Sequence, residues 1–477
     1  MAIAETNRIR EYQVKALSGD GVEFQAVLTR MTRYLAVFEI YNAALVLRVS
    51  EALTDFQIIL SGRTVYLGRA ILRNQINDDS RMICEVTLDE GSWKDVEFSP
   101  ELFLNGRLHE QFREFIRGWQ ELYRVLPEYK LVIADLQSFL SDLRLSLDQV
   151  ELGMNSMPVE TRRVLENKVA LELGKSAAPM CSMLFEKFES VAQTIQPESL
   201  PAHQTYARRQ LHPLVSGSPF FYRCFAKPLG YAGDYEMVNM MLRNPCEGRT
   251  LFDKVLNLWF LDQPPVVAHR NRIDYLVDQL MQFTARACGQ NKKTRILTVG
   301  CGPAQEIQQF LAEQHISNQT DVTLLDFNEE TLRYTGAILA DLKAKNSRQT
   351  TLRYIKKSVH QLLKESGRAA EIPTNAQYDL VYCAGLFDYL SEQVCRRLMD
   401  IMYRWVSPGG LLIATNVTTH NPSRGWMEHV TDWHLIYRDA RQMRGLTPSA
   451  ASADSVRVVS EPSGVNVFLE VEKAGYA

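Results

Sequence analysis

The chain has 477 residues, of which 46% are hydrophobic and 23% are charged, and its formal net charge is −3. This composition is typical of a globular protein, and the balanced charge excludes a global basic field that would recruit nucleic acid or an anionic membrane. The length favours two or three domains over one compact unit.

The eight cysteines form no C-x-x-C pair and do not cluster with histidines. We therefore expect no metal site and no disulfide framework, and the cysteine usage is typical of a reducing, cytoplasmic location. The first residues lack the apolar core of a signal peptide, and the chain has no run of about 18 apolar residues. We expect no transmembrane segment.

Residues 1–99 have the pattern of a small β-barrel or sandwich. Polar turns separate short apolar runs at residues 22–28, 35–40, 44–49, 56–60, 64–67 and 82–88. The layout resembles a PilZ-like barrel, a type that often binds the signalling nucleotide cyclic di-GMP. Its binding motif R-x-x-x-R is missing, because Arg30 and Arg33 are too close together and no matching serine motif follows. We expect a degenerate, ligand-free relative or an interaction barrel.

Residues 100–215 change to helical spacing and form an expected helical connector. Apolar residues recur at helical intervals over 108–122 and 131–147, and Met157-Pro158 begins a third helix. Such stripes are most often core or a helix-pair seam, so we assign them no chemistry. A homodimer through this connector or the barrel is a hypothesis.

Residues 216–290 are interpreted as an aromatic lid loop followed by helices. Proline and glycine interrupt a stretch rich in Phe, Tyr and Met, and a loop of this kind must pack against something or cover a pocket. A helix is expected after the Pro264-Pro265 pair. Early polar residues on that helix are interpreted as a solvated face, with His269 or Arg270 touching a ligand as the alternative; these residues are His269, Arg270, Arg272 and Asp274.

Residues 295–306 read R-I-L-T-V-G-C-G-P-A-Q-E and predict a buried strand, a glycine turn and a helix starting near Pro303. A strand that runs through two glycines into a helix N-terminus lets a ligand approach bare backbone. A dinucleotide fingerprint requires a third glycine, and Gln305 stands at that place. The turn therefore argues against a nicotinamide or flavin site.

The sequence that follows alternates strands with helices and ends in a hairpin, which is an α/β pattern. Strands are expected at residues 322–325, 352–356, 378–383 and 411–417, a turn at 408–410, a helix over 391–405, and hairpin strands at 456–459 and 465–471. Asp326 follows the first of these strands, where a carboxylate can accept both hydroxyls of a ribose. The alternative is that Asp326 only caps a helix starting near Asn328.

The motif V-G-C-G-P-A-x-E resembles motif I of the class I S-adenosyl-L-methionine (SAM)-dependent methyltransferases, in which the loop lies along the methionine part of the cofactor. The resemblance implies a Rossmann-like domain over residues 291–477, with the barrel and the helical segments in front of it. It also implies cofactor contacts by Gly300, Cys301, Gly302, Pro303, Glu306, Asp326, Phe327, Ser358, Val359, Ala384 and Gly385.

Three further stretches resemble the family that makes the extracellular factor, a 3-hydroxy fatty acid methyl ester. They are K-P-L-G-Y-A-G-D-Y-E-M (227–237), A-G-L-F-D-Y-L (384–390) and the segment 421–438. The resemblance covers about the last 60% of the chain, from Ala202. It implies O-methylation of a hydrophobic acid such as a hydroxy fatty acid, with a methyltransferase for another small molecule or a protein, or a non-catalytic regulatory binding protein, as alternatives.

A carboxylate acceptor is ionised at neutral pH and needs alignment and desolvation rather than a general base. An alcohol or amine acceptor would need one, and Asp388, His429 and Asp432 are candidates, although Asp388 could instead be a helix N-cap. We expect segments 219–236 and 429–438 to build the acceptor pocket jointly. The aromatic residues expected to shape this pocket are Tyr231, Tyr235, Tyr389, Trp433 and Tyr437, and the alternative for each is ordinary packing. Arg438 is expected to pair with an acid group of the acceptor.

Overall fold

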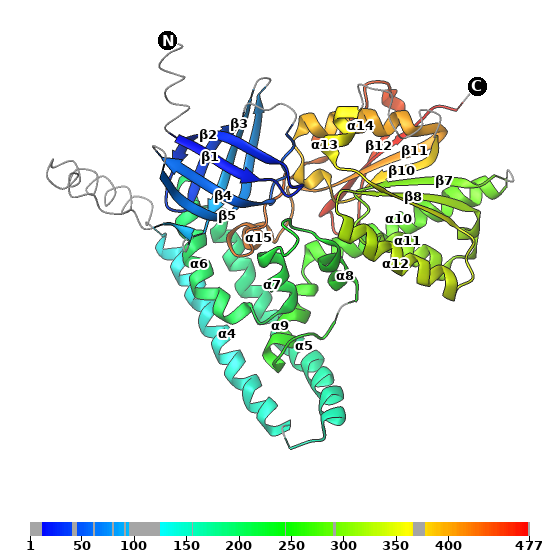
Figure 1. Ribbon diagram of the computed structural model, residues 1–477. Helices are drawn as coiled ribbons and strands as arrows, with labels where there is room; N and C mark the ends of the chain where they lie inside the picture. The colour runs from blue at the N-terminus through cyan, green and yellow to red at the C-terminus, as the bar shows by residue number, and fades with distance from the viewer. Residues whose placement is uncertain are drawn as a thin grey trace, which may run out of the picture.

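The computed structural model describes residues 12–40, 45–60, 63–78, 81–89, 92–94, 125–154, 156–243, 245–289, 292–365 and 377–475. A β-barrel and an α/β domain lie side by side, and a helical region lies against both of them (Figure 1). Among the described residues, no helix has both the length and the apolar character needed to cross a membrane.

Six antiparallel strands close the barrel in the order β1-β2-β3-β6-β5-β4, as the spacing of the apolar runs predicts. They are β1 (Tyr12–Leu17), β2 (Glu23–Met31), β3 (Leu35–Ile40), β4 (Ala52–Leu60), β5 (Arg63–Asp78) and β6 (Arg81–Leu88). Aromatic rings in edge and tilted contact run from Phe38 through Phe56 to Tyr66 and fill the interior. The described barrel core is therefore packed with side chains.

The strand expected at residues 44–49 is not formed over its described part, residues 45–49. Its described part is an irregular segment that leaves the barrel and packs on the α/β domain, where the Val49 N–H donates to the Tyr389 carbonyl at 3.0 Å. Contact with another domain replaces the strand pairing that the apolar run suggested. β1, which was not among the expected runs, closes the barrel by pairing with β2 and β4.

The helical region shares one apolar core. Its helices are α4 (Pro127–Met154), α5 (Val159–Ala192), α6 (Leu200–Val215), α7 (Pro219–Ala226), α8 (Tyr235–Arg243) and α9 (Leu251–Leu261). The helices expected over 131–147 and from Pro158 are confirmed, while the helix expected over 108–122 lies outside the described residues. The same core includes Trp426 and Val430 from a later part of the chain, so it extends beyond the expected connector.

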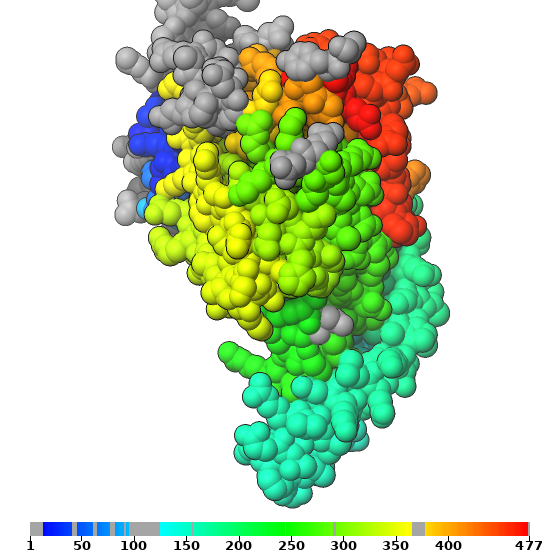
Figure 2. Space-filling model, turned by 90° about the vertical axis from the view of Figure 1, so that its right-hand side faces the viewer, coloured from blue at the N-terminus to red at the C-terminus, as the bar shows by residue number. Residues whose placement is uncertain are grey.

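The far end of the α4–α5 hairpin projects away from the rest of the molecule (Figure 2). Large apolar side chains are exposed there, among them Leu145, Leu152, Val159 and Val164. Exposed apolar patches often mark interaction surfaces. The homodimer hypothesis stays a prediction that sedimentation velocity would check.

The α/β domain is built on a seven-stranded sheet in the order β12-β13-β11-β10-β7-β8-β9. The strands are β7 (Thr294–Val299), β8 (Thr320–Asp326), β9 (Thr351–Lys356), β10 (Tyr378–Cys383), β11 (Val406–Val417), β12 (Val456–Ser460) and β13 (Asn466–Glu472). The first five are mutually parallel, and β13 pairs antiparallel with both β11 and β12. The expected Rossmann-like sheet with its final hairpin is confirmed.

Helices cover both faces of this sheet. One face packs against α10 (Pro264–Cys288), α11 (Gln305–Glu313) and α12 (Glu329–Lys345), and the other packs against α13 (Val359–Glu365), α14 (Glu392–Trp405) and α16 (Ala440–Arg444). The turn expected at 408–410 is instead part of β11, which shifts its register against β10 there. Gly409 has φ 78°, so the glycine serves an irregularity inside a strand.

Strand order reverses between β7 and β10, since β8 follows on one side of β7 while β10 lies on the other. In open parallel sheets, ligands bind outside the carboxyl ends of the strands at such a switch point. The glycine turn after β7 and the segment after β10 both emerge at this edge. The topology therefore predicts a ligand site at the same residues that the sequence indicates.

Candidate active site

The glycine turn lies at the bottom of a cavity at the switch point. Gly300, Gly302 and Ala304 all have left-handed backbone geometry, with φ values of 68°, 51° and 50°. The N–H groups of Gly300 and Cys301 donate to the Leu325 carbonyl at 2.8 and 3.0 Å, which ties the turn to β8. A Cβ added at Gly302 would meet open space, so a ligand can lie against this backbone. The helix begins at Gln305, two residues later than expected.

Asp326 lies at the carboxyl end of β8 and is 5% exposed. Its carboxylate accepts hydrogen bonds from the Gly302 N–H at 3.0 Å and the Asn328 N–H at 2.9 Å. Burial raises the pKa of this carboxyl, and the two N–H groups partly offset that shift. The helix-cap alternative is wrong, because Asn328 itself caps α12 through the Thr331 N–H.

Most of the other expected cofactor residues line the same cavity, namely Gly300, Cys301, Gly302, Pro303, Glu306, Asp326, Phe327, Val359, Ala384 and Gly385. Ser358 does not, because it precedes α13 and its Oγ accepts from the Gln361 N–H at 3.3 Å. Glu306 is buried and accepts a hydrogen bond from the Tyr382 hydroxyl at 2.7 Å. Glu306 therefore both lines the cavity and links the helix after the glycine turn to β10.

The barrel contributes a wall that the sequence did not reveal. Arg48, from the segment that leaves the barrel, is 7% exposed and lies 3.9 Å from the centre of the Phe327 ring. It is held by ion pairs to Asp20 at 2.7 Å and Glu51 at 3.5 Å. The available signal is an Arg and a Glu three residues apart within an apolar run, which suggests a buried pair but not its location.

Beyond the glycine turn, the cavity continues into an apolar chamber formed by the helical region. The cavity volume is about 230 Å³, many times the 10–15 Å³ that one water molecule requires. Aromatic and Met side chains dominate the chamber, including Phe185, Phe221, Met237, Met241, Phe260 and Trp426. Both expected segments, 219–236 and 429–438, supply lining residues.

The first of these segments is only in part the loop that was expected, because α7 occupies Pro219–Ala226 and only residues 227–234 form a loop before α8. Ser218 caps α7 by accepting from the Phe221 N–H, and Pro219 occupies the first helical turn. This is an ordinary helix start that the density of aromatic residues obscured. Tyr235, at the start of α8, lines the cavity, donates its hydroxyl to Glu330 at 2.9 Å and joins α8 to α12.

Two of the four proposed catalytic residues lie off the cavity. The Nδ1 of His429 is 2.8 Å from the Tyr129 hydroxyl, and burial lowers the pKa of this histidine well below its usual value. Arg438 donates to the carbonyls of Phe387 at 2.7 Å and Leu390 at 2.6 Å. Its guanidinium is committed to holding the segment after β10, so it is not placed to pair with an acceptor's acid group.

Asp388 does line the cavity and is 3% exposed, but it is not a helix N-cap. Its Oδ1 accepts from the Val417 N–H at 2.6 Å, linking the segment after β10 to the end of β11. Burial raises the pKa of Asp388, while Val417 and nearby arginines lower it. Tyr389, the next residue, accepts a hydrogen bond from the Trp433 indole at 3.1 Å.

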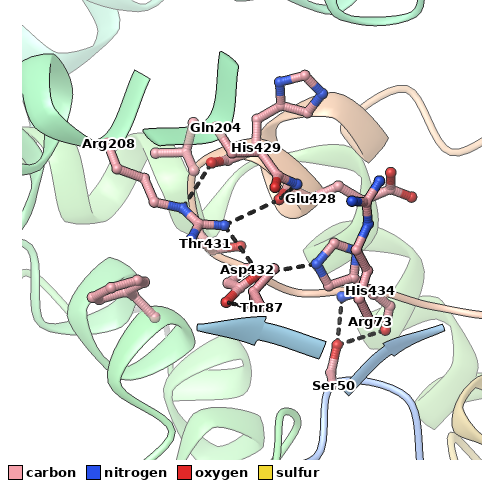
Figure 3. Close-up of polar contacts among 12 residues, drawn as sticks. Ser50, Arg73, Thr87, Gln204, Arg208, Glu428, His429, Thr431, Asp432 and His434 are labelled. Carbon is pink, nitrogen blue, oxygen red and sulfur yellow. Dashed lines mark hydrogen bonds and ion pairs between the residues drawn. The ribbon is translucent and has the colours of Figure 1, made fainter. Parts of the chain in front are cut away.

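Asp432, considered as a base, is instead a junction between three parts of the molecule (Figure 3). It accepts from the Thr87 hydroxyl of the barrel at 3.0 Å and pairs at 3.0 Å with Arg208 of α6. Its other neighbour is His434 Nε2 at 3.0 Å, and the main chain at His434 contacts Ser50 of the barrel. The residues that alternate with Asp432 and His434 line the cavity instead; they are Thr431, Trp433 and Leu435.

The prediction that the polar face of α10 meets solvent is wrong in part. His269 and Arg272 are 9% and 7% exposed, and both line the cavity. Arg270 points elsewhere and donates to the carbonyls of Met241 and Leu261 at 2.8 and 2.7 Å. Polar residues on a helix face can turn to a cavity as readily as to solvent, and sequence periodicity does not distinguish the two.

Comparison with known families matches residues 297–412 to a methyltransferase domain. No curated protein matches the sequence. Solved structures similar to this chain include one titled as a possible exported protein of Bordetella parapertussis, at 15% identity and TM-score 0.39, with 67% of this chain and 100% of that chain covered. Another is the magnesium protoporphyrin IX methyltransferase of Synechocystis with bound S-adenosylhomocysteine (SAH), at 13% identity, TM-score 0.32, and coverage of 44% and 84%.

Proposed function

We propose that the chain is a SAM-dependent methyltransferase that O-methylates a hydrophobic carboxylic acid, such as a hydroxy fatty acid. The observation that carries this proposal is one continuous cavity, with the glycine turn and Asp326 at one end and the apolar chamber at the other. The methyltransferase-domain match over 297–412 supports the cofactor, and the aromatic and Met lining supports a hydrophobic acceptor.

When bound, SAM supplies an electrophilic methyl group on its sulfonium. Transfer of that methyl group would form a bond from an acceptor carboxylate oxygen to the methyl carbon while the carbon–sulfur bond breaks, and would leave SAH and a methyl ester. No proton is transferred, so the chain's task is to align the reactants and exclude water. The described lining fits this task, since Asp388 is engaged with Val417 and His429 lies off the cavity.

An alcohol or amine acceptor remains the second candidate because His269 lines the cavity. Burial and the neighbouring arginines lower its pKa well below the usual value, so the imidazole is neutral and could accept a proton. A regulatory protein that binds the cofactor without turnover is the alternative from another class. Product analysis separates all three.

Val266→Trp should shorten the acyl chain that the enzyme prefers. Val266 is 4% exposed and faces the chamber, so the larger side chain removes acceptor space at a cost in stability of about 1–3 kcal/mol. The measurement is the methyl ester yield over a series of fatty acids of increasing length. Val267→Trp, on the adjoining residue outside the lining, is the matched control, and an unchanged profile in Val266→Trp would place the acceptor elsewhere.

For the barrel, we propose that it is a degenerate PilZ-like unit that works as a structural partner of the site and does not bind cyclic di-GMP. Arg30 and Arg33 lack the binding spacing, and the barrel interior is packed around Phe38 and Phe56. Titration of the full chain with cyclic di-GMP should give no saturable signal at micromolar concentration. Saturable binding would show the barrel to be a sensor.

A further inference from the structure

Arg272 lies on α10 where the two halves of the cavity meet. Its guanidinium packs on the backbone at Gly385, since a Cβ added to that glycine would lie 3.0 Å from Arg272 Nη1. Gly385 follows β10, on the opposite side of the switch point from the glycine turn. Arg272 therefore faces both the expected cofactor end and the mouth of the apolar chamber.

Among the residues that the structure describes, no carboxylate forms an ion pair with this buried cation. In that part of the chain, the Nε of Arg272 also has no acceptor. Its Nη2 contacts the His269 ring, at 2.7 Å from Nδ1 and 3.5 Å from Nε2. The carboxylates that attract it, Asp388 and Glu306, are bonded to the Val417 N–H and the Tyr382 hydroxyl.

The other well-buried arginines in the described part of the chain have acceptors for their guanidinium groups. These acceptors are carboxylates for Arg48 and uncharged oxygens for Arg348 and Arg438. Arg48 pairs with Asp20 at 2.7 Å, although it faces the same cavity. A buried charge without a partner costs several kcal/mol, so the N–H groups of a buried guanidinium normally find acceptors, and a carboxylate or phosphate also neutralises the charge. An arginine left open toward a ligand cavity is therefore best explained by an anion that arrives with the ligand.

We propose that Arg272 is the anchor for a ligand carboxylate in this cavity, with His269 holding its guanidinium in place. The proposal rests on the proposed function, and it replaces Arg438 with Arg272 as the residue that pairs with an acid group. Two ligands could supply the carboxylate: the amino-acid part of the cofactor, or a hydrophobic acid acceptor. Both present a planar pair of oxygens that suits the guanidinium fork.

The test compares ligands that differ in the carboxylate. Arg272→Gln and the wild type are titrated with SAH and with 5′-methylthioadenosine, which lacks the amino-acid part, and then with decanoic acid and decan-1-ol. We expect affinity for one carboxylate-bearing ligand to fall about ten- to a hundredfold, while its carboxylate-free counterpart changes less than about twofold. A selective loss for SAH identifies the cofactor as the source, and a selective loss for decanoic acid identifies the acceptor.

Two further variants separate anchoring from folding. Arg272→Lys keeps the charge but not the fork and should lose less affinity than Arg272→Gln, and Arg270→Gln, which removes a neighbouring arginine bonded to carbonyls, should not discriminate between the paired ligands. Equal losses for both members of each pair, or no loss at all, would overturn the proposal. If the wild type itself binds no SAH, the proposed function fails, whereas the comparison of acid with alcohol still tests Arg272.

Discussion

Asp326→Ala should weaken SAH binding about ten- to a hundredfold, which corresponds to about 1.5–3 kcal/mol for a lost hydrogen bond to a charged acceptor. The carboxylate lies at the switch point beside Gly302, where its remaining lone pairs could accept hydrogen bonds from the ribose hydroxyls. Isothermal titration calorimetry gives the affinity. Asp321→Ala, on the same strand but paired with Lys293 near its start, is the control and should bind as the wild type does.

The Asp326 variant also loses its bonds to two backbone N–H groups, so its thermal unfolding is recorded alongside. Unchanged SAH affinity would remove Asp326 from the site. Preferential binding of NADH by the wild type would reinstate the nicotinamide reading that Gln305 argues against.

Asp432→Asn should lower the free energy of unfolding by about 3–5 kcal/mol, the usual cost of removing one partner of a buried ion pair. The substitution leaves Arg208 without its anion, and the nearby buried Lys227 loses the same attraction. Asparagine tolerates the left-handed backbone at this position, where φ is 53°, so the change isolates the charge. Urea unfolding measures the effect, and exposed Asp454→Asn is the control.

The pH dependence of Asp432 has a definite sign. Burial opposes its ionisation, but Arg208 and His434 outweigh burial and hold the pKa of the carboxyl well below its usual range. Its stabilising contribution is therefore complete above about pH 4 and is lost as the pH falls through the lowered pKa. A loss below 1 kcal/mol in Asp432→Asn, or the same acid sensitivity in variant and wild type, would contradict this role.

The sequence predicted the features that depend on local pattern. The strand before Gly300, the acidic residue at the end of β8 and the final hairpin all follow from apolar runs broken by glycine or a turn. The barrel was predictable for the same reason, except at β1, which was not expected, and at residues 45–49. That segment is apolar because it packs on another domain, and a run of apolar residues does not reveal its partner.

The site residues that were misjudged share a different cause. Along 431–435, alternate residues face opposite sides, so Trp433 lines the cavity while Asp432 and His434 hold the barrel. A polar residue close to the sheet edge can therefore be structural. Arg272 was missed for the converse reason, because a polar helix face was taken to meet solvent when it meets a cavity.

The proposed methyltransferase activity can be measured directly as methyl transfer. The purified chain is incubated with SAM carrying a deuterated methyl group and with decanoic acid, 3-hydroxydecanoic acid or decan-1-ol, and the products are identified by mass spectrometry. We expect labelled methyl esters of the acids, no labelled ether from the alcohol, and loss of product in Asp326→Ala. Labelled ether, or no labelled product from any hydrophobic acceptor while SAH binds tightly, would contradict it.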